Sequence, residues 1–347
     1  MVKLGDVINV HYGKALKADQ RVSNGSVHVF GSSGIVGNHD KTLCSYPTII
    51  IGRKGSVGAI TWAPDGGWII DTAYYVEIKD NNKLDLRYLF YILSGIDLTK
   101  KTITTSIPGL NRDDLYDTFI KLPPFEEQKR IVDLLDKAEG IRQKREQAIK
   151  LADDFLRATF ATMYGNPITN PKKWPVHLMG EIIEFKGGNQ PPKSDFIFEP
   201  KQGYIRLVQI RDFKSDKYAT YIPQEKAKRI FEVDDVMIAR YGPPVFQILR
   251  GLSGSYNVAL MKASPKENIR KGFIFYLLQL PEYHDVVVKN SERTAGQTGV
   301  NLELLNKFNV PLPPIYYQDE ILARLARIEK FKEKIEISLN HLEMQFL

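Results

Sequence analysis

The sequence GLNRDDLYDTFIKLPPFEEQKRI at residues 109–131 occurs again, loosely, as GVNLELLNKFNVPLPPIYYQDEI at residues 299–321. The two copies align over 23 residues without a gap, and matching positions differ by 190 in residue number. Each copy leads directly into a long charged segment with helical periodicity. Because the period is far longer than that of a solenoid, the repeat indicates a duplicated domain whose halves each end in a helix. The identical pairs are Gly109/Gly299, Asn111/Asn301, Leu115/Leu305, Leu122/Leu312, Pro123/Pro313, Pro124/Pro314, Gln128/Gln318 and Ile131/Ile321.

Shorter matches extend the duplication toward the start of each half. Their offset drifts from 175 to 190 while their order is kept, so the insertions are expected between shared core elements, in loops. The β-branched run at residues 46–53 predicts a buried strand, and residues 86–93 predict a short amphipathic helix. The matching segments are 4–8 with 179–183, Gly13 with Gly188, 46–53 with 235–240, and 86–93 with 271–278.

The two halves differ most in four polar segments, which are rich in Gly, Ser, Tyr, Trp, Arg, Gln and Asn. In the first half these are residues 27–40 and 59–71, and in the second half residues 204–223 and 243–257. Two similar scaffolds that carry different polar loops suggest two similar binding modules with different targets.

The long segments that follow each Leu-Pro-Pro step predict helices with a heptad seam, because apolar positions recur at alternating steps of four and three residues. An ordinary amphipathic surface helix is the alternative, but the same spacing in both copies favours a coiled coil. Arg142 and Lys332 occupy the same seam position, so an antiparallel pairing, which offsets the two charges, is favoured. Three prolines within residues 164–175 predict an ordered linker. The seam positions are Ile131, Leu135, Ala138, Arg142, Arg145, Ile149, Ala152 and Leu156, and Ile321, Leu325, Ile328, Lys332, Ile335, Leu339, Leu342 and Phe346.

The composition is that of a globular protein, with 43% hydrophobic and 26% charged residues. A net charge of +7 is a weak indication of a polyanionic partner. Cys44 is the single cysteine and is expected as a small buried hydrophobe, and the six histidines form no pair at metal-ligand spacing. Residues 1–10 contain no signal-peptide core, and no apolar run approaches membrane-spanning length, so we expect a cytoplasmic protein.

Sequence signatures of catalysis are absent. The glycine-rich residues 31–37 and 52–58 have neither the P-loop nor the Rossmann spacing, so tight turns are favoured over nucleotide binding. The Leu-Pro-Pro steps at Leu122 and Leu312 differ from the Asn/Asp-Pro-Pro-Tyr/Phe tetrapeptide of amino-methyltransferases, because leucine cannot accept a hydrogen bond from the target amine. No Phe-x-Gly-x-Gly site for S-adenosylmethionine is present either. The chain is therefore predicted to be non-catalytic.

The chain resembles the specificity subunit of type I restriction–modification enzymes over its whole length. The resemblance implies an α+β fold, in which two globular α/β target recognition domains are joined by two long helices in an antiparallel coiled coil, with a pseudo-twofold internal repeat. In many members further sequence follows the second copy, whereas this chain ends at Leu347. The ordered markers are residues 4–6 (LGD), 51–56 (IGRKGS), 122–128 (LPPFEEQ), 163–167 (MYGNP), 174–175 (WP) and 312–318 (LPPIYYQ).

The resemblance also implies a division of labour. Each recognition domain would read one half of a bipartite target in double-stranded DNA, and the helices would set the spacer and dock two modification (methyltransferase) subunits. No cofactor is expected in this chain. S-adenosylmethionine, ATP and Mg are expected in the modification subunits and in restriction (translocase and nuclease) subunits, and no membrane partner is expected. The implied domains are 1–124 and 176–314 for recognition, 125–163 and 315–347 for the spacer helices, and 164–175 for the linker.

DNA sequence is read by Arg, Lys, Asn and Gln on base edges, whereas phosphates are held by Lys, Ser, Thr and backbone amides. By matched position, Arg53 with Lys54 and Arg240 with Tyr241 are the leading candidates. For any single residue, a solvated surface or turn position is the open alternative, and for the whole chain it is a coiled-coil protein–protein scaffold without DNA specificity. The DNA-binding candidates are Ser32, Ser33, Arg53, Lys54, Ser56, Thr105, Ser106, Asn111, Arg206, Gln209, Arg211, Lys214, Arg240, Tyr241, Gln297, Thr298 and Asn301.

Overall fold

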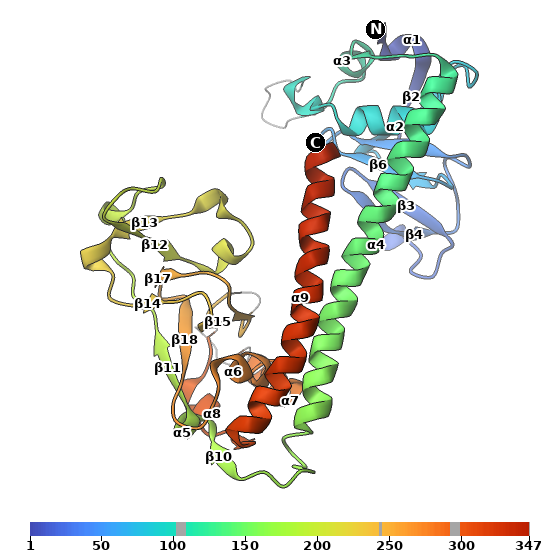
Figure 1. The fold of residues 1–347 in the computed structure, drawn as a ribbon. Helices are drawn as coiled ribbons and strands as arrows, with labels where there is room; N and C mark the ends of the chain where they lie inside the picture. The colour runs from blue at the N-terminus through green and yellow to red at the C-terminus, as the bar shows by residue number, and fades with distance from the viewer. Residues whose placement is uncertain (102–108, 243–244, 292–298, 347) are drawn as a thin grey trace. The chain divides into compact units, whose positions relative to one another are not determined.

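The computed structural model describes residues 1–101, 109–242, 245–291 and 299–346 (Figure 1). The candidates Thr105, Ser106, Gln297 and Thr298 lie outside the described residues. The chain divides into two compact units, unit 1 at Met1–Gln143 and unit 2 at Lys144–Leu347. Each unit has its own hydrophobic core.

The core of unit 1 is a four-stranded antiparallel sheet in the order β2-β8-β5-β6. The predicted buried strand is β5 (Thr48–Gly52), and its β-branched residues pack well inside a sheet. The predicted helix is α2 (Leu86–Ser94), which begins where Asp85 accepts a hydrogen bond from Tyr88 N. The other strands are β2 (Ile8–Tyr12), β8 (Ala73–Ile78) and β6 (Ile60–Ala63).

A smaller sheet in unit 1 contains segments that the sequence predicts as loops. In it β3 (Val27–Gly31) pairs antiparallel with β4 (Gly34–His39) and parallel with β7 (Trp68–Ile69). The loop prediction is wrong here, because these segments satisfy their backbone groups by pairing with one another. The remaining elements are β1 (Val2–Lys3) paired with β9 (Phe119–Ile120), the helices α1 (Leu4–Val7) and α3 (Arg112–Tyr116), and 3-10 turns at Ala18–Gln20 and Leu98–Lys101.

Unit 2 repeats this arrangement, as the duplication predicts. Its main sheet has the order β11-β18-β15-β16, and β11 pairs with β18 in the same register as β2 with β8. The central strand of its smaller sheet, β12, again has one antiparallel neighbour, β13, and one parallel neighbour, β17. Residues 204–208 and 221–223 therefore also form strands where loops are predicted. The strands are β10 (Val176–Leu178), β11 (Ile183–Gly187), β12 (Tyr204–Val208), β13 (Tyr221–Pro223), β14 (Ile230–Phe231), β15 (Val236–Ala239), β16 (Ile248–Leu249), β17 (Gly254–Tyr256), β18 (Leu260–Pro265) and β19 (Asn309–Pro311).

The helices of unit 2 follow the same plan with one addition. The helix α7 (Pro281–Ser291) has no counterpart among the described residues of unit 1. Cys44, in unit 1, is buried as predicted. The short helices are α5 (Met179–Ile182), α6 (Lys271–Leu277) and α8 (Leu302–Asn306), and 3-10 turns lie at Lys193–Asp195, Ile210–Phe213, Asp216–Tyr218 and Gln224–Lys226.

Each long helix begins directly after its Leu-Pro-Pro step. α4 extends over Phe125–Tyr164 and α9 over Ile315–Phe346, within one residue of the predicted bounds. The second proline of each step supplies the first acceptor, because Gln128 N donates to Pro124 O and Gln318 N donates to Pro314 O, both at 3.1 Å. A proline fits this position because it needs no helical N–H of its own.

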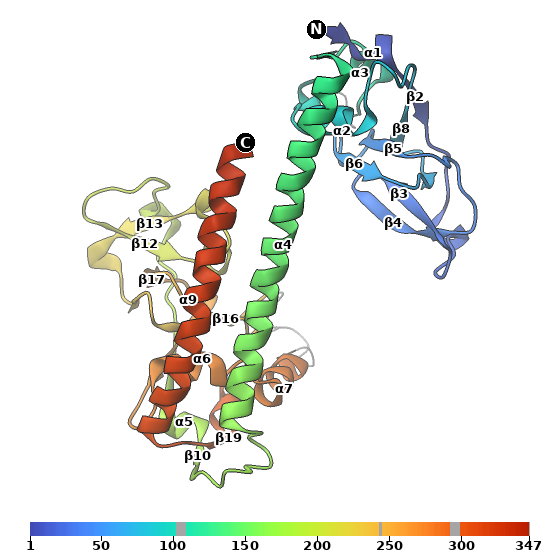
Figure 2. The same ribbon diagram turned by 45° about the vertical axis from the view of Figure 1, so that its right-hand side comes forward.

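Within unit 2, α9 packs antiparallel against the part of α4 that begins at Lys144 (Figures 1 and 2). Lys332 Nζ lies 2.7 Å from Asp153 Oδ1, and Arg145 donates to Ser338 O at 2.7 Å. Residue numbers therefore rise along one helix as they fall along the other. The seam charge of Lys332 meets an acidic residue, which confirms the predicted antiparallel pairing for this part of the helices.

The exposure of individual side chains confirms the predicted seam in unit 2. The seam residues Leu156 and Leu325 are 6% and 1% exposed, whereas Leu151 and Phe155, off the seam, are both 59% exposed. The linker that follows α4 is ordered, since Asn170 donates to Trp174 O. No helix in the described part of the chain is long and apolar enough to cross a membrane.

Candidate nucleic-acid interface

In unit 1, three turns meet where β5 ends. Arg53 O accepts a hydrogen bond from Leu110 N at 3.0 Å, and Lys54 pairs with Gly109 in an isolated bridge. A Cβ atom on Gly52 would lie 2.8 Å from Ser32 O, so the hairpin turn between β3 and β4 reaches the same point. The structure thus brings the candidates Ser32, Arg53 and Lys54 together. Ser33 and Ser56 are exposed in the same turns.

The glycine-rich segment after β5 is a pair of tight turns, as predicted. Gly55 and Gly58 have φ values of 80° and 76°, a backbone conformation that residues with a Cβ rarely adopt. Gly58 N donates to Gly52 O at 2.8 Å, which folds the turn back on the strand. This fold holds Arg53, Lys54 and Ser56 at one edge of the sheet.

Two arginines flank one exposed tyrosine ring at this edge. The guanidinium carbons of Arg53 and Arg112 lie 5.0 and 5.3 Å from the ring centroid of Tyr12, which is 46% exposed. Stacked guanidinium and aromatic groups of this kind also stack on nucleic-acid bases. The sequence prediction missed Tyr12 and Arg112. The one feature of the sequence that could have indicated these residues is that Tyr12 is next to the matched position Gly13, and Arg112 is next to the matched position Asn111.

Unit 2 holds Arg240 in the same way that unit 1 holds Arg53. Arg240 O accepts from Val300 N at 3.1 Å, which matches the bond from Leu110 N to Arg53 O. The Arg240 guanidinium carbon lies 5.0 Å from the ring centroid of Tyr241, which is 37% exposed. The position of Tyr12 is taken by Gly187, and a Cβ there would lie 2.9 Å from an Arg240 nitrogen. The two sites share a backbone frame and differ in their side chains.

The other candidates of unit 2 lie on and after β12. The carbonyl of Val208, the residue before Gln209, accepts a hydrogen bond from Asn257 N. A Cβ atom on Gly188 would lie 2.0 Å from Asn257 O, so Gly188 lies next to the same asparagine. Gln209 therefore begins its turn at the same end of the unit as Gly188. The Arg206 side chain is paired with Asp216 at 2.7 Å.

Two further candidates lie in the turn after Gln209. Arg211 stacks on Tyr218 at 5.5 Å and lies 4.0 Å from a carboxylate oxygen of Asp212. Burial raises the pKa of that aspartate, although Gln209 N donates to it. Lys214 is exposed at the end of the same turn.

Asn111 and Asn301 have local structural roles. Asn111 Oδ1 accepts from Asp113 N at 3.2 Å, and Asn301 Oδ1 accepts from Leu304 N at 3.1 Å. Each asparagine is thus the N-cap of a short helix, α3 or α8. The capping role explains why both copies carry an asparagine here. A DNA contact by Asn111 or Asn301 stays a prediction.

The edge of unit 1 carries positive charge that the protein does not neutralise. In the described part of the chain, no ion pair involves Arg53, Lys54 or Arg112, and the Arg53 guanidinium donates to the carbonyl of Asp71 at 3.2 Å. Arg240 likewise forms no ion pair with a described residue, and its buried Nε has no hydrogen-bond partner there. Cations left without internal partners are suited to bind phosphates or guanine edges. The described residues contain no group of acids, histidines or cysteines that could hold a metal ion.

A family model described as "Type I restriction modification DNA specificity domain" matches residues 1–151 and 171–343. The chain belongs to this family. Specificity subunits of type I systems are non-catalytic, in agreement with the missing motifs of catalysis. Nothing in the comparisons supports the alternative of a scaffold without DNA specificity.

Relatives of this specificity chain span most of its length. The EcoBI specificity subunit of Escherichia coli is 22% identical over 336 residues, which cover 85% of this chain and 70% of the relative. The MjaVIII specificity subunit of Methanocaldococcus jannaschii is 21% identical over 305 residues, covering 76% and 69%. The S subunit of a type I restriction–modification system from M. genitalium has a TM-score of 0.62 at 16% identity, covering 99% of this chain and 92% of that one. A structure described in terms of the assembly and conformational transition of the type I system has a TM-score of 0.56 at 19% identity, covering 99% and 94%. These structures show the same fold.

In each unit of the specificity chain, a carboxylate on the long helix holds the recognition module. In unit 1, Asp136 Oδ1 accepts from Arg87 Nε at 2.9 Å and from the Tyr91 hydroxyl at 2.5 Å. Burial and the hydrogen bond to Asp136 raise the pKa of Tyr91 to about 12. Arg87 also stacks on Trp62, 4.9 Å from its ring centroid.

Unit 2 builds the same group from different positions. Glu329 accepts from the Tyr276 hydroxyl and from Arg250, which stacks on Phe275 at 4.0 Å. Tyr276 matches Tyr91, but the residue that matches Asp136 is Ala326, so the carboxylate lies three residues further along the helix. The sequence prediction missed these groups, because the carboxylate and the arginine of each group come from unmatched positions.

Proposed function

We propose that each unit reads one half of a bipartite sequence in double-stranded DNA, and that the chain acts as the specificity subunit of a type I restriction–modification complex. The observation that carries this proposal is the pair of strand-end arginines. Arg53 and Arg240 hold equivalent positions, neither has an acidic partner among the described residues, and the side chains around them differ. Two sites with the same backbone arrangement but different side chains are suited to read two different half-sites.

The proposed division of the chain has recognition domains at residues 1–124 and 176–314, a linker at 164–175, and spacer helices at 125–163 and 315–347. The long helices would set the distance between the half-sites. They would also dock two modification subunits. Support for docking comes from large apolar side chains that the helices leave exposed, among them Leu151, Phe155 and Phe331 at 59%, 59% and 61%. In this arrangement the modification subunits supply S-adenosylmethionine, and restriction subunits supply ATP and Mg.

Methylome sequencing of cells that carry the chain with its modification subunit tests the proposal. We expect N6-methyladenine at one bipartite, asymmetric target. Exchange of residues 1–124 for those of a relative should change one half-site and leave the other unchanged. Changes in both half-sites, or no methylation that depends on the chain, would contradict the assignment.

The spacer function has its own test. Deletion of one heptad, residues 137–143, shortens a helix by about 10 Å, since each residue adds ~1.5 Å. The preferred spacer should change, or methylation should be lost. Unchanged methylation of the original site would refute the spacer role and leave the half-site assignment standing.

A further inference from the structure

The two units use the same scaffold around α1 and α5. Lys79 Nζ donates to Gly5 O at 2.6 Å in unit 1, and Lys266 Nζ donates to Gly180 O at 2.6 Å in unit 2. The strand after each short helix has the same register, with Val10 opposite Val76 and Phe185 opposite Ala263. Differences between the side chains on this scaffold can therefore be compared position by position.

In unit 1 a tyrosine fills the space beside this scaffold. Tyr116, on α3, packs against Gly5, where a Cβ would lie 2.9 Å from the Tyr116 Cβ. Its hydroxyl accepts a hydrogen bond from Val10 N at 2.9 Å. Val10 lies on β2, an edge strand whose outward N–H groups have no strand partner. Tyr116 therefore supplies both the apolar filling and the missing acceptor.

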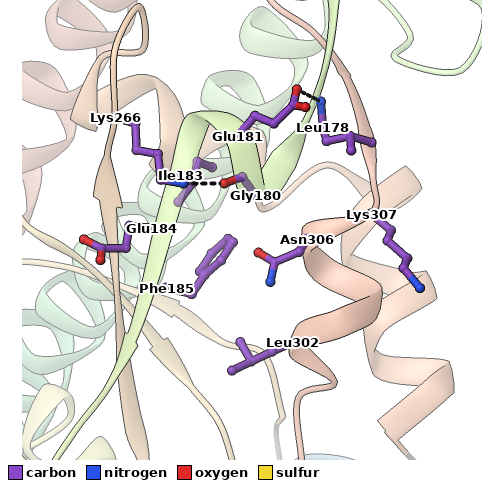
Figure 3. A pocket seen from close by; sticks show the side chains of 10 residues that line it. All are labelled: Leu178, Gly180, Glu181, Ile183, Glu184, Phe185, Lys266, Leu302, Asn306 and Lys307. Carbon is purple, nitrogen blue, oxygen red and sulfur yellow. Dashed lines mark hydrogen bonds between the residues drawn. The ribbon is translucent and has the colours of Figure 1, made fainter.

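In unit 2 this ring is absent. Asn306 takes the position of Tyr116, and Leu302 takes that of Arg112, which in unit 1 lies over the Tyr116 ring. The space becomes a pocket of about 460 Å³ (Figure 3), which is within the ~300–1,000 Å³ usual for ligand pockets. Phe185, Leu302 and Asn306 surround the hollow, while Lys266 points to Gly180 (Figure 3). Within the described residues, no side chain accepts a hydrogen bond from Phe185 N, the counterpart of Val10 N.

The charges around the pocket favour a polypeptide over a nucleic acid as its occupant. Lys307 pairs with Glu303 at 2.5 Å, and Lys266 is bound to a backbone carbonyl. Glu181 and Glu184 also line the pocket and balance the charges of Lys266 and Lys307, so the lining carries no excess of cations that would attract a phosphate. The pocket thus offers an apolar wall, a backbone donor and little net positive charge.

We propose that the pocket beside β11 binds a tyrosine side chain of a partner polypeptide, in the place that Tyr116 fills in unit 1. The partner's ring would pack between Phe185 and Leu302. Its hydroxyl would accept the hydrogen bond from Phe185 N. Unit 2 thereby gains a docking point that unit 1, with its own tyrosine in place, does not offer.

Titration of the isotope-labelled chain with p-cresol, which is the tyrosine side chain alone, tests the pocket. We expect a saturable shift of the Phe185 amide resonance, and binding of toluene, which lacks the hydroxyl, at least five-fold weaker. Asn306→Tyr should abolish binding and keep or raise the Tm, because it fills the pocket as Tyr116 does. Leu302→Trp is a second filling variant in case the first does not fold. No saturable shift, equal binding of toluene, or undiminished binding by the folded variants would overturn the proposal.

Photo-crosslinking in the assembled complex tests the occupant. A benzophenone amino acid in place of Lys307 should cross-link to a tyrosine-containing peptide of another polypeptide, and Asn306→Tyr should abolish that product. The same probe in place of Asp117, the matched position in unit 1, is the control and should give none. Cross-links to DNA alone, or none, would contradict the proposal. Complex assembly and methylation are measured in the same preparation, so a failure of the specificity function is recognised separately.

Discussion

The side-chain amide of Gln128 makes the same three hydrogen bonds as that of Gln318. Gln128 Oε1 accepts from Asp85 N, and its Nε2 donates to Lys83 O and Pro123 O, at 2.8 to 2.9 Å. Gln318 Oε1 accepts from Arg270 N, and its Nε2 donates to Asn268 O and Pro313 O, at 2.8 Å. Both side chains are fully buried. Each glutamine thus joins the start of a long helix to the start of α2 or α6.

Replacement of Gln318 by leucine should destabilise unit 2 by about 3 kcal/mol, because three backbone groups lose their partner in a place that water does not reach. Chemical denaturation followed by circular dichroism measures this change. Gln224→Leu, at an exposed position, is the matched control and should change the free energy of unfolding by less than about 0.5 kcal/mol. Equal effects of the two substitutions would show that the buried hydrogen bonds contribute little.

The carboxylate that holds each module is expected to be coupled to its tyrosine. A double-mutant cycle of Tyr276→Phe and Glu329→Gln should give a coupling of about 1 kcal/mol in the free energy of unfolding, since the hydroxyl and the carboxylate share one hydrogen bond. Ala326→Asn, at the position that matches Asp136, should show no coupling with Tyr276→Phe. Coupling of equal size at both positions would argue against a specific contact.

Unit 2 should lose stability in acid through Asp235. Burial acts to raise the pKa of this carboxyl, but hydrogen bonds from Lys271 and from Glu232 N, with the charge of Lys262, lower it below its ordinary value of 3.8. A lowered folded-state pKa gives stabilisation that is present above the unfolded value and is lost as the pH falls through the folded value. The free energy of unfolding should therefore decline below a pH of about 3.8.

Asp235→Asn should flatten this acid limb and lower the stability at neutral pH. Asp234→Asn is the control, because the Asp234 side chain is 69% exposed. It should change the acid limb less than Asp235→Asn does. If the free energy of unfolding declined as steeply in acid for Asp235→Asn as for the wild type, the decline would be due to other carboxylates.

The ion pair between Lys332 and Asp153 should contribute to the pairing of α9 with α4. Reversal of either charge alone is expected to destabilise unit 2, and the swap of both should recover about 0.5 to 1 kcal/mol, since the two side chains are partly buried. Thermal unfolding of the four proteins gives the coupling. The exposed pair Glu320 and Arg324 is the comparison and should show almost none. A swap that recovers nothing would mean that this ion pair does not contribute to the pairing of the two helices.

Arg53→Ala and Arg240→Ala should each lower the affinity for the DNA target by about 1 to 3 kcal/mol and relax the sequence preference at one half-site only. Electrophoretic mobility shifts with half-site variants, at two salt concentrations, measure both effects. Arg130→Ala serves as the control, because its side chain is 84% exposed on α4. Loss of preference at both half-sites from one substitution would contradict independent reading by the two units.

Much of the fold follows from local patterns in the sequence. The β-branched run gives β5, the heptad spacing gives the long helices, and the second proline of each Leu-Pro-Pro step sets where they begin. The antiparallel direction could be inferred as well, because a parallel pairing would place Lys332 against Arg142. These features depend on residues close in the chain or on a repeated spacing.

The candidate site was predicted only in part. Arg53 and Lys54, predicted from matched positions, lie together with Ser32, predicted from the divergent segment at residues 27–40, because each follows the end of a strand in unit 1. Tyr12 and Arg112 were missed, because the contacts of Tyr12 with Arg53 and with Arg112 join segments about 40 and about 100 positions apart. Asn111 was predicted from its match to Asn301, yet that match is explained by helix capping.

By itself the sequence determined that the protein is a duplication with two long helices, because an ungapped repeat and a heptad period can be read without knowing any contact. Only the tertiary structure decided what the repeated residues do. It shows that Gln128 and Gln318 are buried and join each long helix to α2 or α6. It also shows that Asn306 in unit 2 leaves open the space that Tyr116 fills in unit 1. The reason is that burial and hydrogen bonding depend on which distant segments face one another, and side-chain identity alone does not specify that.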